Sequence, residues 1–278
     1  MAAFSLTTAL RTEYQQLFDT CEIRPERANL VEKLINNIEP NRIRYSAVGD
    51  PLGIPWYFVG VIHNMESSLD FKGHLHNGDP LTARTVHVPV GRPKTGQAPF
   101  TWEESAMDAL QLKRLDQWSD WSVPGTLYKL EAYNGFGYRS RHPEVLSPYL
   151  WSFSTHYTTG KYVGDGTFSP SAVSQQCGAA ILLRRMSEVG TIQFKPDGTP
   201  ITGLGRDTAE SSEMSARFSP LVRFSKKEKS PLVEELQKTL NMFPGIFLKV
   251  DGIAGPRTSD ALKNVTGHFL VGDPRGNQ

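Results

Sequence analysis

Apolar residues recur at helical spacing along the first third of the chain. They predict helices within residues 5–38, where three- and four-residue steps place the larger apolar side chains on one face. The segment 56–67, WYFVGVIHNMES, is strongly apolar and predicts another helix. Thr101 and Glu104 stand three residues apart before a further periodic stretch, which is the spacing of a helix-capping box. The first part of the chain is therefore expected to be mainly helical.

Glycine and proline break this pattern in later segments. Residues 71–93 contain several of each, together with a short alternating run at 85–88, and predict a small hairpin or a loop. Glycine and aromatic residues dominate 125–166, after which a helix is expected over 170–186. Residues 191–229 are rich in Gly, Pro, Ser and charged residues, which predicts a linker or an extended arm.

The composition excludes several classes of protein. Of the 278 residues, 38% are hydrophobic and 21% are charged, which provides enough apolar material for a core and argues against a wholly disordered chain. The formal net charge of +1 gives no support for nucleic-acid binding as the main function. The two cysteines, Cys21 and Cys177, are too few for a disulfide framework.

No segment has the pattern of a membrane anchor or of a secretory signal. Apolar runs are all shorter than the ~20 residues that a membrane-spanning helix needs. Arg11 and Glu13 interrupt the N-terminal segment before the core of a signal peptide could form. We therefore expect cytoplasmic synthesis without a signal peptide, and action elsewhere only after release or dedicated export. We also expect a monomer with no cofactor, no nucleic-acid partner and no membrane insertion.

A compact pattern begins again at residue 230. Ser230 and Pro231 suit the cap and the first turn of a helix with inward apolar residues. A tight turn follows at 250–252, and Thr258 is expected to open a second helix. A unit of about 40 residues is near the lower limit for independent folding, so its core must be compact.

These residues resemble the peptidoglycan-binding module found on cell-wall hydrolases. Five short motifs carry the resemblance: Leu236-Gln237, Leu240-Asn241, Val250-Asp251-Gly252, Gly255-Pro256-Arg257-Thr258 and Ala261-Leu262. The resemblance implies a small helical module over 230–278 that binds bacterial peptidoglycan. Within it, we expect Asp251 and Arg257 to belong to the wall-binding surface.

A wall-binding module is usually attached to an enzyme that cuts the wall, and Glu66 is the best candidate for its acid. Glu66 lies near the end of the helix predicted at 56–67, with Ile62 and Val59 on the same stripe four and seven residues earlier. Desolvation by that stripe and the negative end of the helix dipole would both raise the pKa of Glu66. Glycoside hydrolysis needs a general acid that is protonated in this way.

The segment after Glu66 offers a second catalytic group. Asp79 stands thirteen residues further on, in an Asn-Gly-Asp sequence that suits a hairpin turn, and Thr85 follows. Asp79 or a neighbouring threonine could polarise the attacking water. A Glu at a helix end before a short β excursion resembles the lysozyme-like superfamily, and more narrowly the modular endolysins of phages and bacteria. The resemblance implies that Glu66 is the general acid and that Asp79 is the second catalytic residue.

The segment EAYNGFGYR at 131–139, and the SPYLWS that follows it, have the chemistry of a sugar-binding cleft. Flat aromatic faces stack on sugar rings, and amides bond acetamido groups. The residues expected to contact substrate are Thr85, His76, Tyr133, Asn134, Tyr138 and Trp151. The alternative is a glycine-rich loop whose aromatic residues complete the core.

Other functions remain open at this stage. His74, His76 and Asp79 have a spacing that resembles metal ligands, so the chain could instead be a zinc-dependent peptidase or amidase of the wall. Our preferred interpretation contains no metal. A chitin- or chitosan-type glycosidase would use similar cleft chemistry, and a non-enzymatic wall-binding protein would need no acid at residue 66.

Together these features predict a mainly α (α+β) protein with two folded parts. We expect a lysozyme-like catalytic domain with a small β-hairpin over 1–190, a linker over 191–229 and a wall-binding module over 230–278. The predicted function is hydrolysis of the glycan backbone of peptidoglycan, between N-acetylmuramic acid and N-acetylglucosamine.

Overall fold

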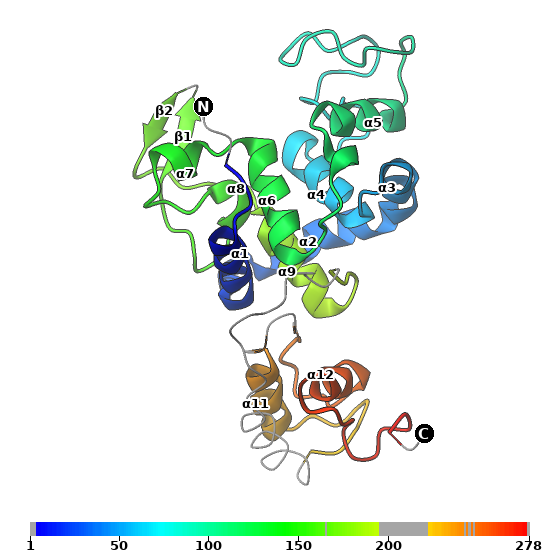
Figure 1. Ribbon diagram of the computed structural model, residues 1–278, viewed down its shortest axis with the longest axis vertical. Helices are drawn as coiled ribbons and strands as arrows, with labels where there is room; N and C mark the ends of the chain where they lie inside the picture. The colour runs from blue at the N-terminus through cyan, green and yellow to red at the C-terminus, as the bar shows by residue number, and fades with distance from the viewer. Residues whose placement is uncertain are drawn as a thin grey trace. The chain divides into compact units, whose positions relative to one another are not determined.

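The computed structural model is mainly helical, as the sequence predicted, and its described residues include one small antiparallel sheet (Figure 1). It describes residues 4–164, 166–194, 222–241, 243, 246 and 248–276. The chain divides into two compact units, residues 1–186 and 187–278. Most of the predicted linker, residues 195–221, lies outside the described residues. None of the helices in the described part of the chain has the length and apolarity needed to cross a bilayer.

Within the first unit, the connection between α4 and α5, residues 68–101, is the longest. The α-helices that begin in the first unit are α1 (Thr8–Thr20), α2 (Ala28–Ile38), α3 (Arg42–Gly49), α4 (Trp56–Ser67), α5 (Trp102–Leu112), α6 (Val123–Asn134), α7 (Gly137–Arg141), α8 (Pro148–Trp151) and α9 (Ala179–Val189). Its strands are β1 (Lys161–Gly164) and β2 (Thr167–Ser169), and its 3-10 turns are η1 (Pro25–Arg27), η2 (Glu39–Asn41), η3 (Asp50–Leu52) and η4 (Leu115–Gln117). The second unit contains α11 (Pro231–Leu240) and α12 (Pro256–Thr266).

Helix α4 lies at the centre of the first unit and has the predicted bounds. Ten consecutive residues, from Trp56 to Met65, are buried. Helices α2 and α3 pack against it, and Gly60 allows the close approach: a Cβ there would lie 2.8 Å from Ile38 Cγ2 and 3.1 Å from the Tyr45 ring. A helix that is apolar on every side must be enclosed in this way.

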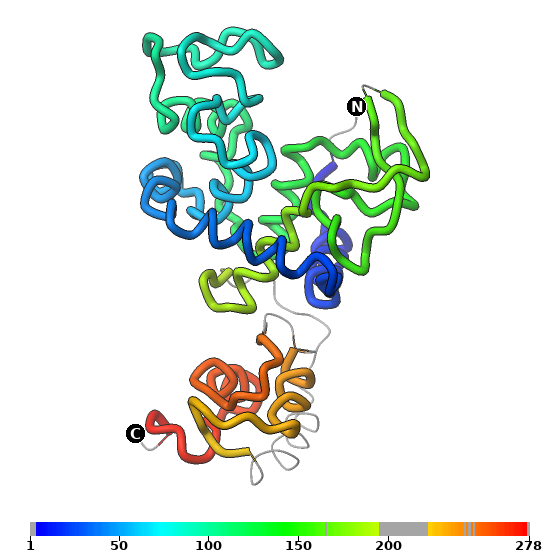
Figure 2. Tube along the Cα trace, turned by 180° about the vertical axis from the view of Figure 1, so that it is seen from behind, coloured from blue at the N-terminus to red at the C-terminus, as the bar shows by residue number. Residues whose placement is uncertain are grey.

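The sheet lies outside the segment where the sequence predicted a hairpin. Strands β1 and β2 pair with Lys161 opposite Ser169 and Tyr162 opposite Phe168. The predicted position, residues 71–93, forms a long loop that extends beyond α5 in Figure 1 and, from behind, in Figure 2. The alternating run at 85–88 in that loop is held by the Asp79 side chain and by backbone hydrogen bonds of Thr85 to Gly91 and Arg92.

The helix predicted over 170–186 begins later, at Ala179, so its first half was predicted wrongly. Gly178 explains the late start. Its N–H donates to the Ser152 carbonyl at 3.0 Å, and a Cβ at this position would lie 2.2 Å from the Leu150 carbonyl oxygen. The backbone before α9 therefore bonds to a remote segment, and these contacts are not available to a helix.

A buried ionic network joins α1, α6 and α7. The Glu131 side chain is 3% exposed and accepts hydrogen bonds from the Tyr14 hydroxyl and, at 2.9 Å, from Arg139 Nη2. Arg139 also donates to Glu13 at 2.8 Å. Burial and the neighbouring Glu131 raise the pKa of Tyr14, so the phenol stays protonated as a donor. The positive charge of Arg139 compensates the Glu131 carboxylate, and the network holds three helices together.

The second unit has its own hydrophobic core between α11 and α12. Helix α11 begins at Pro231 with Ser230 as its cap, as predicted. Helix α12 begins at Pro256, two residues before the predicted start. Val222 is 2% exposed within this core, so the unit includes residues ahead of position 230.

The Leu-Gln and Leu-Asn pairs of α11 fasten the loop that follows it. Gln237 Oε1 accepts from the N–H groups of Asp251 and Gly252 at 2.9 and 3.0 Å, and Gln237 Nε2 donates to Asp251 Oδ1 at 3.0 Å. Asn241 pairs in the same manner with the N–H and carbonyl of Leu248, at 2.6 and 2.8 Å. Two side-chain amides thus replace the pairing that a strand would provide.

Gln237→Ala should destabilise the second unit. The substitution leaves the N–H groups of Asp251 and Gly252 without their acceptor in a part of the module where Gln237 is 2% exposed. We expect a loss of about 1–3 kcal/mol in the free energy of unfolding, measured by denaturant unfolding. The control is Lys238→Ala on the exposed face of the same helix. Equal effects of both substitutions would contradict the assigned role of Gln237.

Candidate active site

Glu66 is the penultimate residue of α4 and is half-buried. The Tyr149 hydroxyl, carried by α8, donates to Glu66 Oε1 at 2.8 Å. Directly after α4, Ser68 and Leu69 both adopt left-handed backbone conformations, with φ values of 52° and 63°. Two successive non-glycine residues in this region are costly and end the helix sharply. The carboxyl group therefore stands where the enclosed helix stops.

Burial raises the pKa of Glu66 above its ordinary value of 4.5. The hydrogen bond from Tyr149 and the positive charge of Lys113 act in the opposite direction but do not cancel the effect of burial. Glu66 forms no ion pair with any residue that the structure describes. Its surroundings favour the protonated carboxyl group.

Two tyrosines stand beside Glu66. Burial, and then the charge of Glu66, raise the pKa of both Tyr133 and Tyr149. Both phenols therefore stay protonated and can donate hydrogen bonds. The structure thus brings Tyr133, a residue predicted to bind sugar, into the surroundings of the predicted acid.

Two further side chains contact Tyr133 or the last turn of α4, and neither was predicted from the sequence. Lys113 Nζ, at the end of α5, donates to the Tyr133 carbonyl at 3.2 Å and lies 4.7 Å from the centre of the Tyr133 ring. Gln176 Nε2 donates to the Met65 carbonyl at 2.8 Å, in the last turn of α4. Both residues lie far from Glu66 in the sequence, where no local pattern marks them.

The other predicted residues of the aromatic segment make no hydrogen bond or charge contact with Glu66 in the described part of the chain. Trp151 is 1% exposed and Tyr138 is 7% exposed. The Tyr138 hydroxyl accepts from the Tyr162 N–H at 3.1 Å, so both aromatic side chains belong to the core. Asn134 is exposed at the end of α6. For Tyr138 and Trp151 the structure matches the alternative in which these aromatics complete the core.

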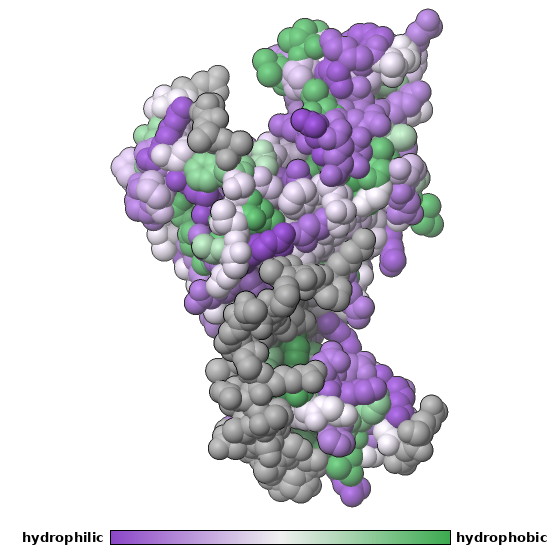
Figure 3. All heavy atoms as spheres, viewed as in Figure 1, coloured by the Kyte–Doolittle hydropathy of each residue, from purple (hydrophilic) through white to green (hydrophobic). Residues whose placement is uncertain are grey.

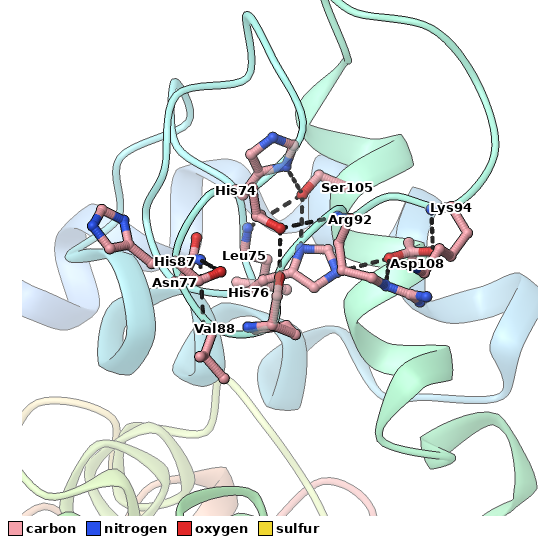
Figure 4. A network of polar contacts seen from close by, with 12 residues as sticks. His74, Leu75, His76, Asn77, His87, Val88, Arg92, Lys94, Ser105 and Asp108 are labelled. Atoms are coloured by element: carbon pink, nitrogen blue, oxygen red, sulfur yellow. Dashed lines mark hydrogen bonds and ion pairs between the residues drawn. The ribbon is translucent and has the colours of Figure 1, made fainter. Parts of the chain in front are cut away.

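Asp79 fastens the loop between α4 and α5, part of which Figure 4 shows. Its carboxylate accepts from His87 Nδ1 at 2.6 Å, from the N–H groups of Val86 and His87 at 2.8 and 2.9 Å, and from Asn77 Nδ2 at 3.1 Å. The bonds from His87, with the others, hold the pKa of Asp79 well below its usual range. These contacts support a role in holding the loop more than the predicted role as a second catalytic carboxylate.

Thr85 is also engaged inside this loop. It is 2% exposed, and its hydroxyl donates to the Pro89 carbonyl and accepts from the Arg92 N–H at 2.9 Å. The hydroxyl that was predicted to contact substrate is therefore used to close the loop.

The two histidines predicted near substrate or metal anchor the loop to α5 (Figure 4). His74 Nδ1 lies 2.8 Å from Ser105 Oγ, and His76 Nε2 lies 2.8 Å from Asp108 Oδ2. Burial lowers the pKa of His76, which favours the neutral imidazole. Within the described ranges, no three His, Cys, Asp or Glu side chains come together as a metal site would require. These positions therefore do not form the ligand set of the zinc alternative.

The second unit contains a shallow hollow of about 170 Å³ beside the turn at 250–252. Asp251 and Arg257, both predicted for the wall-binding surface, line it together with Lys249. The guanidinium of Arg257 donates to the carbonyl of Ser187 at 2.6 Å. The structure thus brings the two predicted residues of this module to one concave surface.

Comparisons of the chain with protein-family models, with curated proteins and with solved structures found no match. The assignment of the site therefore depends on the geometry around Glu66 and on the chemistry of its neighbours.

Asp79→Asn should destabilise the first unit at pH 7, because it removes the charge that holds His87 and Asn77. Since the folded-state pKa is lowered, this contribution is present above the unfolded-state pKa and is lost as the pH falls through the folded value. The difference from wild type in thermal unfolding should therefore shrink on acidification. The matched control is Asn77→Ala, which removes a tie to the same loop and leaves the carboxylate in place. The two variants should show similar levels of the glycan hydrolysis that the sequence predicts. A loss of about 100-fold confined to Asp79→Asn would show that the carboxylate takes part in the chemistry.

Proposed function

We propose that this protein is a peptidoglycan hydrolase that cleaves the glycan backbone, with Glu66 as the general acid. One observation carries the proposal: a half-buried carboxyl group at the end of an enclosed helix, with a raised pKa, a phenol as its hydrogen-bond partner and no ion pair within the described residues. A glycosidase acid needs this state, because it must hold its proton near neutral pH and then release it to the leaving oxygen.

In the proposed reaction, Glu66 protonates the glycosidic oxygen between N-acetylmuramic acid and N-acetylglucosamine. The bond from the sugar carbon to that oxygen breaks, and a water attacks the carbon. The proton that this water releases passes to the solvent, from which the Glu66 carboxylate is protonated again. Tyr149 orients the acid through its 2.8 Å hydrogen bond. Tyr133 is 8% exposed and borders the acid from within the core, and Asp79 acts through the loop that it holds.

The second unit supports this proposal through its resemblance to a wall-binding module. Its hollow, lined by Asp251 and Arg257, is proposed to contact the wall polymer. Anchoring would raise the concentration of glycan around the catalytic unit. We propose that the first unit has the lysozyme-like fold, and that the protein acts as a monomer on the wall after release from the cytoplasm.

Glu66→Gln should bind purified walls as wild type does but should fail to clear them. The amide cannot donate the acidic proton, so a loss of at least about 100-fold in activity is expected. Turbidity clearing measures the activity, and sedimentation with walls measures the binding. The control is Glu144→Gln, which changes a carboxylate that is 65% exposed.

Mass spectrometry of the released fragments identifies the bond. New reducing ends on muramic acid are expected. New amino groups would contradict the proposal and would favour a peptidase or an amidase. Clearing by Glu66→Gln at more than a few per cent of the wild-type rate would remove Glu66 as the acid.

Tyr149→Phe should move the alkaline limb of the pH–activity profile to higher pH. The Tyr149 hydroxyl bonds the ionised carboxylate and lowers the pKa of Glu66, so its removal raises that pKa further. A general acid is active while protonated, and therefore activity falls as the pH rises through its pKa. The kcat/KM profile on soluble glycan fragments measures the shift. A limb that stays in place, or moves to lower pH, would contradict the assigned role of Tyr149.

A further inference from the structure

The long loop before α5 presents three exposed apolar side chains at its tip. Val86, Val88 and Val90 are 68%, 84% and 62% exposed. They occupy alternate positions, and Figure 3 shows hydrophobic residues at the outer end of this loop. Single exposed apolar residues are normal on a protein surface, whereas a cluster marks a site of interaction.

Several polar backbone groups of this tip are paired from inside the loop. Asp79 accepts from the N–H groups of Val86 and His87 at 2.8 and 2.9 Å. Asn77 Nδ2 donates to the His87 carbonyl at 3.1 Å and lies 3.5 Å from the Val88 carbonyl. Entry of a loop into an apolar layer is costly when its backbone groups lose water without gaining partners. For the paired groups named here that cost is reduced, because their partners are already in place.

Backbone groups of Pro89, Gly91 and Thr85 in this tip are also hydrogen-bonded within the loop. The Thr85 hydroxyl bonds the Pro89 carbonyl, and the Gly91 N–H donates to the Thr85 carbonyl at 2.8 Å. The valine side chains are therefore carried on a backbone whose conformation is fixed before it meets a partner, which lowers the entropic cost of binding.

Exposed basic side chains lie in the same loop as these valines, whereas the carboxylate that contacts the tip, Asp79, is 7% exposed and faces the inside of the loop. Residues 80–102 contain no Asp or Glu. Arg84 and Lys94 are exposed, and a Cβ at Gly91 would lie 3.6 Å from Lys94 Nζ, which places this ammonium group beside the tip. The His87 side chain is 79% exposed. The loop thus combines exposed apolar side chains with two exposed cations, Arg84 and Lys94.

We propose that this loop docks into the headgroup layer of a bilayer that contains anionic phospholipids. Such a surface offers negative headgroups to the two cations and, just below the headgroups, acyl chains to the valines. An anionic polysaccharide would satisfy the cations but would leave the valines in water. The proposed contact is interfacial and involves no membrane-spanning segment. It does not depend on the hydrolase activity proposed for Glu66.

Vesicle sedimentation with the full-length chain tests this contact. We expect binding to vesicles of phosphatidylcholine mixed with phosphatidylglycerol and little binding to phosphatidylcholine alone. The triple substitution Val86→Ser, Val88→Ser and Val90→Ser should weaken binding by at least about tenfold, because it removes methyl groups that enter the acyl layer. The matched control is Ile43→Ser, since Ile43 on α3 is 84% exposed, as Val88 is. The control should bind as wild type does.

A second measurement covers the case in which the triple variant does not fold. Val88→Trp should shift its fluorescence to shorter wavelength when anionic vesicles are added, and Ile43→Trp should not. Glu66→Gln should bind vesicles normally, which separates this proposal from the proposed enzymatic function. Absence of wild-type binding to anionic vesicles would overturn the proposal. Equal binding by wild type and a folded triple variant would do the same, because it would indicate a cationic surface without apolar insertion.

Discussion

The enclosure of α4 is the constraint on which the rest of the first unit depends. Ten consecutive residues of this helix are buried, so other elements must cover it on every side, and Gly60 lets Ile38 and the Tyr45 ring approach its backbone. Enclosure ends with the helix, and Glu66 stands at that end. The raised pKa of Glu66 is therefore a direct consequence of how the core is built.

The carboxyl groups of Glu131 and Glu66 have contrasting surroundings in the first unit. Glu131 receives a hydrogen bond from Tyr14 and an ion pair with Arg139, so its charge is compensated. Glu66 receives a hydrogen bond from Tyr149 and forms no ion pair within the described residues. The cost of burying a charge is offset where a cation and hydrogen-bond donors meet it, and burial without a cation raises the pKa of a carboxyl group. The first arrangement stabilises the fold, and the second leaves a group that can exchange its proton.

Polar side chains replace strand pairing in both units. Asp79 and Asn77 bond the backbone of the long loop in the first unit, and Gln237 and Asn241 bond the loop after α11 in the second. A buried backbone needs partners for its N–H and carbonyl groups, and short polar side chains supply them where no neighbouring strand is present. Loops held in this way can keep a definite shape and present exposed side chains, such as Val88, at fixed positions.

The sequence by itself determined the helices that local signals define. The apolar run at 56–67, the capping residues of α5 and α11, and the position of Glu66 at a helix end all depend on neighbours within a few residues. Only the tertiary structure decided where the strands form, why Gly178 delays α9, and which side chains surround Glu66. Tyr149 and Lys113 reach it from other helices. Hydrogen bonds and desolvation arise between residues that are remote in sequence, so local periodicity carries no information about them.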